Sequence, residues 1–267
     1  MVVEEVAGGD GAAAALEALL PADVPTRPRA LAVLDGLLTG RAWADDVAAP
    51  SWVVVVETGD GTVYVGGEPG RSQLRSLLGQ VQTRSGDLVF GFSGPRDPVR
   101  ALLPPDPPYV GQAVDFTDRV PPDDEDAMLN GPVPDGLRLV PIDADLLRQT
   151  EWYADTLHAF GSEAAWATHG VGRCLLERSR VVAESMAGPR TRGLLEMGVA
   201  TRGPYRRRGY GTLVSRHVAG ACEAAGDRVW WNTAASNLPS QRIARALGFR
   251  TERWYDLVAY PPGALRG

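Results

Sequence analysis

A short segment rich in arginine and glycine carries the most readily interpreted chemistry of this sequence. Arg206–Gly211 reads RRRGYG, and it lies between a predicted strand that ends at Thr201 and a predicted helix that runs from about Tyr210 to Ala225. Backbone N–H groups and the helix dipole favour an anion at a helix amino terminus. Gly209 and Gly211 allow close backbone approach, and arginine offers forked donors to phosphate oxygens. The segment therefore predicts a phosphate-binding loop.

A second interpretation of the same segment is a solvated basic surface beside two glycines. The chain contains 27 basic residues and all are arginine, a bias that reduces the weight of any single one. A Gly-x-Gly pattern is also common by itself. The elements around the segment therefore have to decide between the two interpretations.

The chain divides into two predicted domains. Residues 119–135 contain a run of acids, several prolines and little apolar periodicity, which predicts a linker between a domain over 1–118 and a domain over 136–267. The first domain is predicted as a small alternating α/β unit, to which we assign no chemistry. Its expected helices are 12–20, 29–38, 71–80 and one begun near Pro95, and its expected strands are 52–57, 62–65, 87–92 and 112–116, with a turn at 59–61.

The second domain has a distinctive predicted order of elements. A first strand is followed by two helices, three strands, a helix, a strand, a helix and a last strand. The predicted ranges are 136–141, 144–160, 162–168, 172–177, 181–186, 194–201, 210–225, 228–233, 239–247 and 253–260. The phosphate loop thus lies between the third of the three successive strands and the helix after them.

In this context the sequence resembles the GNAT superfamily of N-acetyltransferases, whose acetyl-CoA loop follows the pattern Arg/Gln-x-x-Gly-x-Gly/Ala. Arg206, Gly209 and Gly211 fill that pattern. A second block of the family, an Asn followed by a small residue and later by a Gly-aromatic turn, is matched by Asn237, Ser240 and Gly248-Phe249. The match covers nearly all of residues 136–260. The preceding domain resembles the subgroup with an extra amino-terminal α/β domain, and more weakly a degenerate copy of the GNAT fold.

The resemblance implies a mixed α/β sheet that is splayed open between its fourth and fifth strands, with the pantetheine arm of acetyl-CoA in the gap. It implies an acyltransferase that moves an acetyl group directly from acetyl-CoA to the primary amine of a small molecule or peptide. The residues it assigns to the cofactor are Met197, Val199, Thr201, Arg206, Arg207, Arg208, Gly209, Tyr210, Gly211, Thr212, Asn237 and Ser240.

The expected chemistry needs a base for the ammonium group of the acceptor. Glu196, on the strand that lines the gap, is the candidate base, with an ion pair to a nearby arginine as the alternative role. Many family members have a Tyr seven residues after the Asn as proton donor, but this chain has Ala244 there. Tyr255, Ser240, Tyr210 and solvent remain candidates for the acid.

Composition limits the other function classes. The net charge of −6 disfavours a nucleic-acid-binding role, and three scattered histidines with two cysteines predict no metal site. The longest apolar run, Trp52–Val56, is far shorter than the roughly 20 residues that span a bilayer, and the acidic start is unlike a secretory signal, so we expect a cytoplasmic protein. The alternative function is a catalytically weak acyl-CoA sensor or assembly module. The sequence identifies neither the acceptor nor the oligomeric state.

Overall fold

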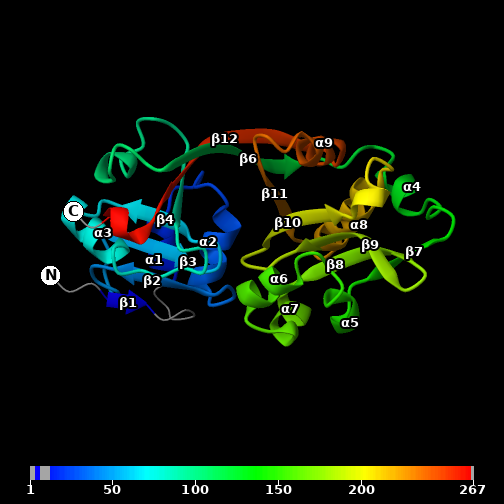
Figure 1. Cartoon of the computed structure of the whole chain (residues 1–267), viewed down its shortest axis with the longest axis horizontal. Helices are drawn as coiled ribbons and strands as arrows, with labels where there is room; N and C mark the ends of the chain where they lie inside the picture. Colours follow the sequence, from blue (N-terminus) through cyan, green and yellow to red (C-terminus); the bar gives the residue numbers. More distant parts are fainter. Residues whose placement is uncertain (1–3, 7–12, 266–267) are drawn as a thin grey trace. The chain divides into compact units, whose positions relative to one another are not determined.

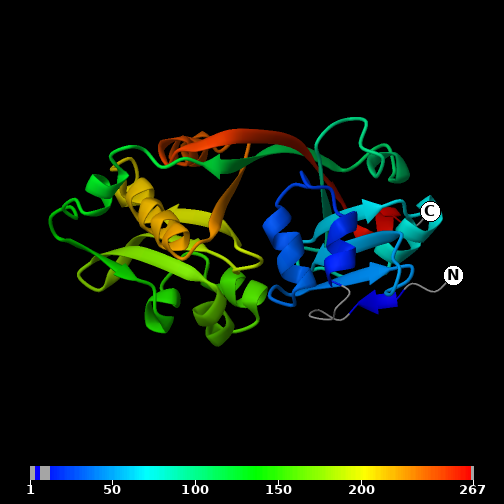
Figure 2. The same ribbon diagram turned by 180° about the vertical axis from the view of Figure 1, so that it is seen from behind.

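The computed structural model describes residues 4–6 and 13–265, which form two compact units. One unit comprises residues 1–113 with 254–267, and the other comprises 114–253. Figure 1 shows the elements of each unit, and Figure 2 shows them from behind. Within the described residues, no helix has the length and apolar character needed to cross a membrane.

The first unit is an α/β layer built on a mixed sheet. Its strands lie in the order β1-β2-β3-β4-β5-β12, and all neighbouring pairs with a recorded register are antiparallel except β4–β5, which is parallel. The elements are β1 (Glu4–Val6), α1 (Ala13–Leu19), α2 (Arg27–Leu34), β2 (Gly40–Ala44), β3 (Trp52–Glu57), β4 (Thr62–Gly67), α3 (Arg71–Leu78), β5 (Leu88–Phe92), η1 (Arg100–Leu102) and η3 (Pro262–Leu265).

The second unit repeats this plan with longer elements. Its strands lie in the order β6-β11-β10-β9-β8-β7, with β10 and β11 parallel and β7 to β10 antiparallel. The elements are β6 (Tyr109–Arg119), α4 (Glu125–Leu129), β7 (Leu137–Pro141), α5 (Ala144–Leu147), α6 (Tyr153–Phe160), α7 (Glu163–His169), β8 (Val171–Glu177), β9 (Arg180–Ala187), β10 (Leu194–Thr201), η2 (Gly203–Tyr205), α8 (Tyr210–Ala224), β11 (Arg228–Ala234), α9 (Leu238–Ala246) and β12 (Phe249–Tyr260).

Two long strands are divided between the units. The last strand of the first half-chain, β6, lies next to β11, and its apolar residues Val114 and Phe116 are fully buried in the core of the second unit. The last strand of the second half-chain, β12, pairs through Asp256–Tyr260 with β5 in the first unit. Each unit therefore completes its sheet with a strand from the other half of the sequence.

This exchange makes the compact units differ from the predicted boundaries at 118 and 136. Residues 254–267 belong with the first unit because β12 pairs there, and 114–118 belong with the second. The predicted linker also contains a helix, α4, whose Glu125 is buried beside Arg119. Arg119 bonds Glu223 as well, so charge pairing orders a segment that has few apolar residues.

Most predicted elements are present, and one is interrupted. The helix expected over 144–160 is two helices, α5 and α6. The Thr150 hydroxyl donates to the Leu147 carbonyl at 2.7 Å, and the Glu151 N–H donates to the Glu184 carboxylate at 2.7 Å. Because these groups do not make the regular i to i−4 bonds of an α-helix, α5 ends here and α6 begins at Tyr153. Only a short η1 forms after Pro95, β1 and β2 were not predicted, and residue 12 of the first expected helix lies outside the described residues.

Helices cover both faces of the sheet in the second unit. Figure 2 shows α8 lying along the strands of that sheet, where Val214, Val218 and Cys222 are fully buried. On the other face, α5 to α7 bury Leu147 and Trp166 against β8 and β9. Both cysteines, Cys174 and Cys222, are buried free thiols, and burial raises their pKa to about 12.

Candidate functional site

The strands β10 and β11 diverge where the sequence predicts the cofactor. They pair in parallel from Leu194 and Arg228 as far as Met197 and Trp231. Beyond that point, Gly198 to Thr201 pair only with β9 on the other side and are half-buried. The outer edge of this stretch therefore offers main-chain groups to a bound extended molecule, as an edge strand does.

Two residues of the loop after β10 have a left-handed backbone. Arg207 and Gly209 have φ of 60° and 79°, both in the left-handed region. Gly209 is the N-cap of α8, a helix of 15 residues, and Arg206 to Gly209 are exposed. The free N–H groups and the positive end of the α8 dipole are thus presented to solvent at one place.

Two further contacts hold this loop, one to the end of β10 and one within the loop itself. Arg206 Nε donates to the Thr201 carbonyl at 2.8 Å, so this arginine holds the end of the strand. The Arg208 guanidinium lies 5.9 Å from the ring centroid of Tyr205. The positive charges are therefore held beside the start of α8.

Gly211 brings the first turn of α8 close to the strands. A Cβ at this position would lie 3.2 Å from Thr201 Oγ1 and 3.4 Å from Val199 Cγ2. It would also lie 3.2 Å from Ile243 Cδ1 on α9. Gly211 thus serves close helix–strand packing, whereas Thr212 is half-buried on the same turn.

The second sequence block forms the start of α9. Asn237 is its N-cap, and its side-chain oxygen accepts the Ser240 N–H at 3.3 Å. The Ser240 hydroxyl accepts the Trp231 indole N–H at 3.0 Å. These bonds tie the start of α9 to β11, and they give both residues a structural role in addition to any contact with a cofactor.

Alternation along β10 divides its residues between two faces. Met197 is buried in the core beneath α8, so only its main chain is available to a ligand. Glu196 is half-buried and is the register partner of Trp230 on β11. A Cβ at Gly198 would lie 2.7 Å from Trp152 Cζ3, so Trp152 covers the strand there.

The predicted residues do not all lie in one unit. Glu196, the residues of 197–212, Asn237 and Ser240 belong to the second unit. Tyr255 belongs to the first unit, where it is buried with its ring 3.2 Å from the Cβ position of Gly91. Tyr255 and Glu196 thus belong to different compact units. Tyr210, at the first position of α8, is half-buried, and Ala244 is fully buried in the core.

Glu184 is a buried acidic residue on β9, the strand beside β10. It is 3% exposed, and burial raises its pKa to about 7, while the bond from the Glu151 N–H acts in the opposite direction. Its register partner on β10 is Ala200. In the sequence, such a residue is recognisable only as an acid among apolar neighbours. Its raised pKa results from burial, which the strand pattern alone does not show.

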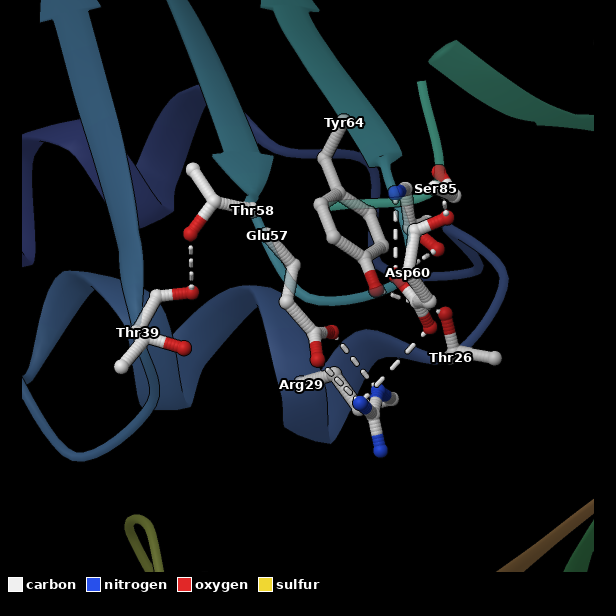
Figure 3. Close-up of polar contacts among 9 residues, drawn as sticks. Thr26, Arg29, Thr39, Glu57, Thr58, Asp60, Tyr64 and Ser85 are labelled. Atoms are coloured by element: carbon white, nitrogen blue, oxygen red, sulfur yellow. Dashed lines mark hydrogen bonds and ion pairs between the residues drawn. The ribbon is translucent and has the colours of Figure 1, made fainter. Parts of the chain in front are cut away.

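The first unit has a polar cluster of its own, at the β3–β4 turn (Figure 3). The buried carboxylate of Glu57 accepts from Arg29 Nε at 2.7 Å, and Asp60 lies 3.7 Å from the same guanidinium. The Tyr64 hydroxyl is 2.8 Å from Thr26 Oγ1, and burial raises its pKa well above the usual value. These contacts connect α2 to the turn, so we interpret the cluster as structural.

The splayed region of the first unit is filled by its own chain. The parallel pairing of β4 and β5 ends at Val63 and Phe90. A Cβ at Gly66 would lie 2.5 Å from the Leu19 carbonyl oxygen, and Pro25 is 3.0 Å from the Cβ position of Gly91. The first unit therefore has the strand arrangement of the second without its open strand edge.

Within 4–6 and 13–265, no three His, Cys, Asp or Glu residues gather closely enough to hold a metal ion.

Comparison with known proteins bears on both units. A family model described as GNAT acetyltransferase matches residues 25–258. A GCN5-related N-acetyltransferase-like protein from Streptococcus suis is 19% identical, with a TM-score of 0.65 over 91% of this chain and 95% of that chain. An acetyltransferase of the GNAT family from Colwellia psychrerythraea is 9% identical, with a TM-score of 0.56 over 96% and 98%.

A third similar structure contains two copies of the fold. The tandem GNAT protein of the clavulanic acid biosynthesis pathway is 15% identical, with a TM-score of 0.58 over 98% of this chain and 99% of that chain. A search of curated proteins found no match. The structural likenesses show the fold, and the family model spans both units. With its splayed β10–β11 pair, its arginine-glycine loop and an additional amino-terminal α/β domain, the chain belongs to the GNAT acetyltransferase family.

Proposed function

We propose that this protein is an acetyl-CoA-dependent N-acetyltransferase that transfers an acetyl group directly to a primary amine of a small molecule or peptide. The observation that carries the proposal is the divergence of β10 from β11 directly before the left-handed, arginine-rich loop at the start of α8. A strand edge and a phosphate-binding loop in series suit a ligand with an extended arm and a pyrophosphate.

The second unit offers donors for each part of acetyl-CoA. The N–H groups of Gly209 to Thr212 and the arginines of 206–208 would hold the pyrophosphate. Main-chain groups of Met197, Val199 and Thr201 would pair with the pantetheine arm, as an added strand pairs with a sheet edge. Asn237, exposed at the start of α9, would contact the arm from the opposite wall. Gly209 has open space around its Cβ position, which fits a close ligand approach.

Glu196 would act as the general base, through a water molecule or directly. The ammonium group must lose one proton before its nitrogen forms the new bond to the acyl carbon. The nitrogen then loses a second proton to solvent as the carbon–sulfur bond breaks and CoA leaves as a thiolate, so that a neutral amide results. The carboxylate of Glu196 would accept the ammonium proton. A backbone N–H on the edge of β10 that faces away from β9 would stabilise the oxyanion. With Ala244 buried at the family's tyrosine position, we propose that solvent reprotonates the thiolate.

The substitution Glu196→Gln tests this function. We expect turnover, measured as amine-dependent CoA release, to fall by about a hundredfold or more, because a positioned base contributes on that order. The dissociation constant for acetyl-CoA, measured by calorimetry, should change little. Glu252→Gln, which alters an exposed acid of the same unit, is the matched control. Unchanged turnover at saturating amine would remove Glu196 from the mechanism.

The alternative function is an acyl-CoA sensor, which the missing tyrosine at Ala244 favours. The two functions give different results with a mixed panel of amines. Tight acetyl-CoA binding without CoA release against any amine would support the sensor, and amine-dependent release would exclude it.

A further inference from the structure

Trp152 lies on the face of β10 that carries Glu196. Side chains alternate along a strand, so residues 196 and 198 share one face of the sheet, while Met197 points to the other. Three ring carbons of Trp152 lie 2.7, 3.0 and 3.7 Å from the position that a Cβ of Gly198 would take. The indole thus occupies the space that a side chain at residue 198 would need.

The main chain that carries Trp152 is held by side chains from distant parts of the sequence. Glu184 of β9 accepts the Glu151 N–H at 2.7 Å. Arg202, just past β10, donates from Nη2 to the Gln149 carbonyl at 2.8 Å. The indole itself packs against the apolar cluster that α5 to α7 form with β8 and β9. These contacts hold the indole in place against β10.

The acyl end of acetyl-CoA would lie beside Gly198 in the binding mode proposed above. The pyrophosphate would lie at the start of α8, so the arm would run along β10 from Thr201 back toward Gly198. β10 and β11 are paired as far as Met197 and Trp231, and the space between the two strands closes there. The thioester would therefore lie where β10 meets β11, next to Gly198.

The two sheet faces differ in exposure at this point. On the α8 face, Met197 and Trp231 are 3% and 1% exposed and belong to the core. On the other face, Glu196, Gly198 and Trp152 are half-buried, so each is partly accessible from solvent. An acyl group at the end of the arm would therefore extend on the Glu196 face, where the indole of Trp152 is its neighbour.

We propose that Trp152 limits the length of the acyl group, so that the protein accepts acetyl-CoA and discriminates against thioesters of longer straight-chain acids. The inference rests on the proposed transferase function and extends it to the donor substrate. A butanoyl group carries two methylene groups more than an acetyl group. Because the indole is held by its main chain and by its packing, the longer chain must displace it or shift the arm along β10.

Calorimetric titration of the full chain with acetyl-CoA and with butanoyl-CoA tests the inference. For the wild type we expect butanoyl-CoA to bind at least about tenfold more weakly, the lower end of the discrimination that one methylene group gives in a confined pocket. Trp152→Ala should make the two dissociation constants about equal. Trp254→Ala makes the same change at an exposed tryptophan of the other unit, and it should keep the wild-type preference.

A second variant covers the case in which Trp152→Ala fails to fold. Trp152→Leu keeps an apolar side chain but shortens it, so the preference for acetyl-CoA should fall severalfold. The ratio of the two dissociation constants is the readout, because a loss of packing alone would weaken the binding of both thioesters alike. Equal affinities in the wild type overturn the inference, as does a preference that survives both substitutions or binding of neither thioester. The transferase function fails separately, if acetyl-CoA binds but no amine of a wide panel gives CoA release.

Discussion

At the scale of single residues, burial gives this protein an acid that titrates near neutrality. Glu184 is anchored to the Glu151 N–H and has a pKa of about 7, against a usual 4.5, because the charged form is poorly solvated. Since the folded state holds this proton more tightly than the unfolded state, the contribution to stability is full below about pH 4.5. It is lost as pH rises through 7.

The substitution Glu184→Gln should therefore flatten part of the pH dependence of stability. A difference of 2.5 pKa units corresponds to about 3 kcal/mol between pH 4 and pH 8. We expect the free energy of unfolding of the wild type to fall relative to that of the variant over this range, because glutamine stays neutral and still accepts the Glu151 N–H. Urea denaturation of both proteins at pH 5 and pH 8 measures the effect. Parallel changes in the two proteins would contradict it.

At the scale of elements, two glycines of α8 allow the ligand contact to be separated from backbone strain. Gly209 at its start and Gly226 just past its end have φ of 79° and 83°, and both have open space at the Cβ position. Alanine at either position should cost about 1 kcal/mol of stability, because both backbones are left-handed.

Only Gly209→Ala should weaken acetyl-CoA binding, by about tenfold, because residue 209 lies at the amino terminus of α8, where we expect the phosphates, and the added Cβ would occupy their approach. Calorimetric titration of both variants, with thermal unfolding to confirm equal strain, measures this. Equal affinity losses in Gly209→Ala and Gly226→Ala would show that the loop is not the phosphate site.

Local pattern predicted many of these elements well. The strand 194–201, the turn at 59–61 and the helix from 210 follow from alternation, a Gly-Asp-Gly turn and apolar spacing. The break between α5 and α6 did not, because it depends on Glu184, which is distant in sequence. The strand β2 was also missed, since Gly40–Ala44 has no β-branched residue and is ordered by pairing with β3. The sequence predicts which residues form the loop before α8, whereas the contact between Asp115 and Asn232 depends on the strand order.

At the scale of the whole molecule, the two units share a strand arrangement but differ in whether a ligand can bind between their diverging strands. Tyr64 to Gly66 of β4 are buried, whereas Gly198 to Thr201 of β10 are half-buried. We expect one molecule of acetyl-CoA per chain, because the Leu19 carbonyl and Pro25 fill the first unit where the arm would lie. Calorimetric stoichiometry on the full chain measures this, and two equivalents would contradict it.

The exchange of β6 and β12 could not be predicted from sequence, because the pattern of a strand shows which face is buried and not which strand lies beside it. It also decides which fragments of the chain can be expected to fold alone. The predicted domain over 136–267 lacks β6, and with it Val114 and Phe116, both fully buried. Losing a core phenylalanine alone costs about 3 to 5 kcal/mol, a large part of the 5 to 15 kcal/mol that stabilises a typical protein.

A fragment of residues 109–253 contains β6 and the entire second unit, so we expect it to unfold cooperatively on heating and to bind acetyl-CoA. A fragment of residues 136–267 should be unfolded or aggregated, because it exposes the open edge of β11 and carries the second half of β12 without β5. Thermal unfolding by circular dichroism and acetyl-CoA titration of the two fragments distinguish these outcomes. If 136–267 folds and binds acetyl-CoA as tightly as 109–253 does, β6 is dispensable, and the second half-chain forms the binding unit without a strand from the first.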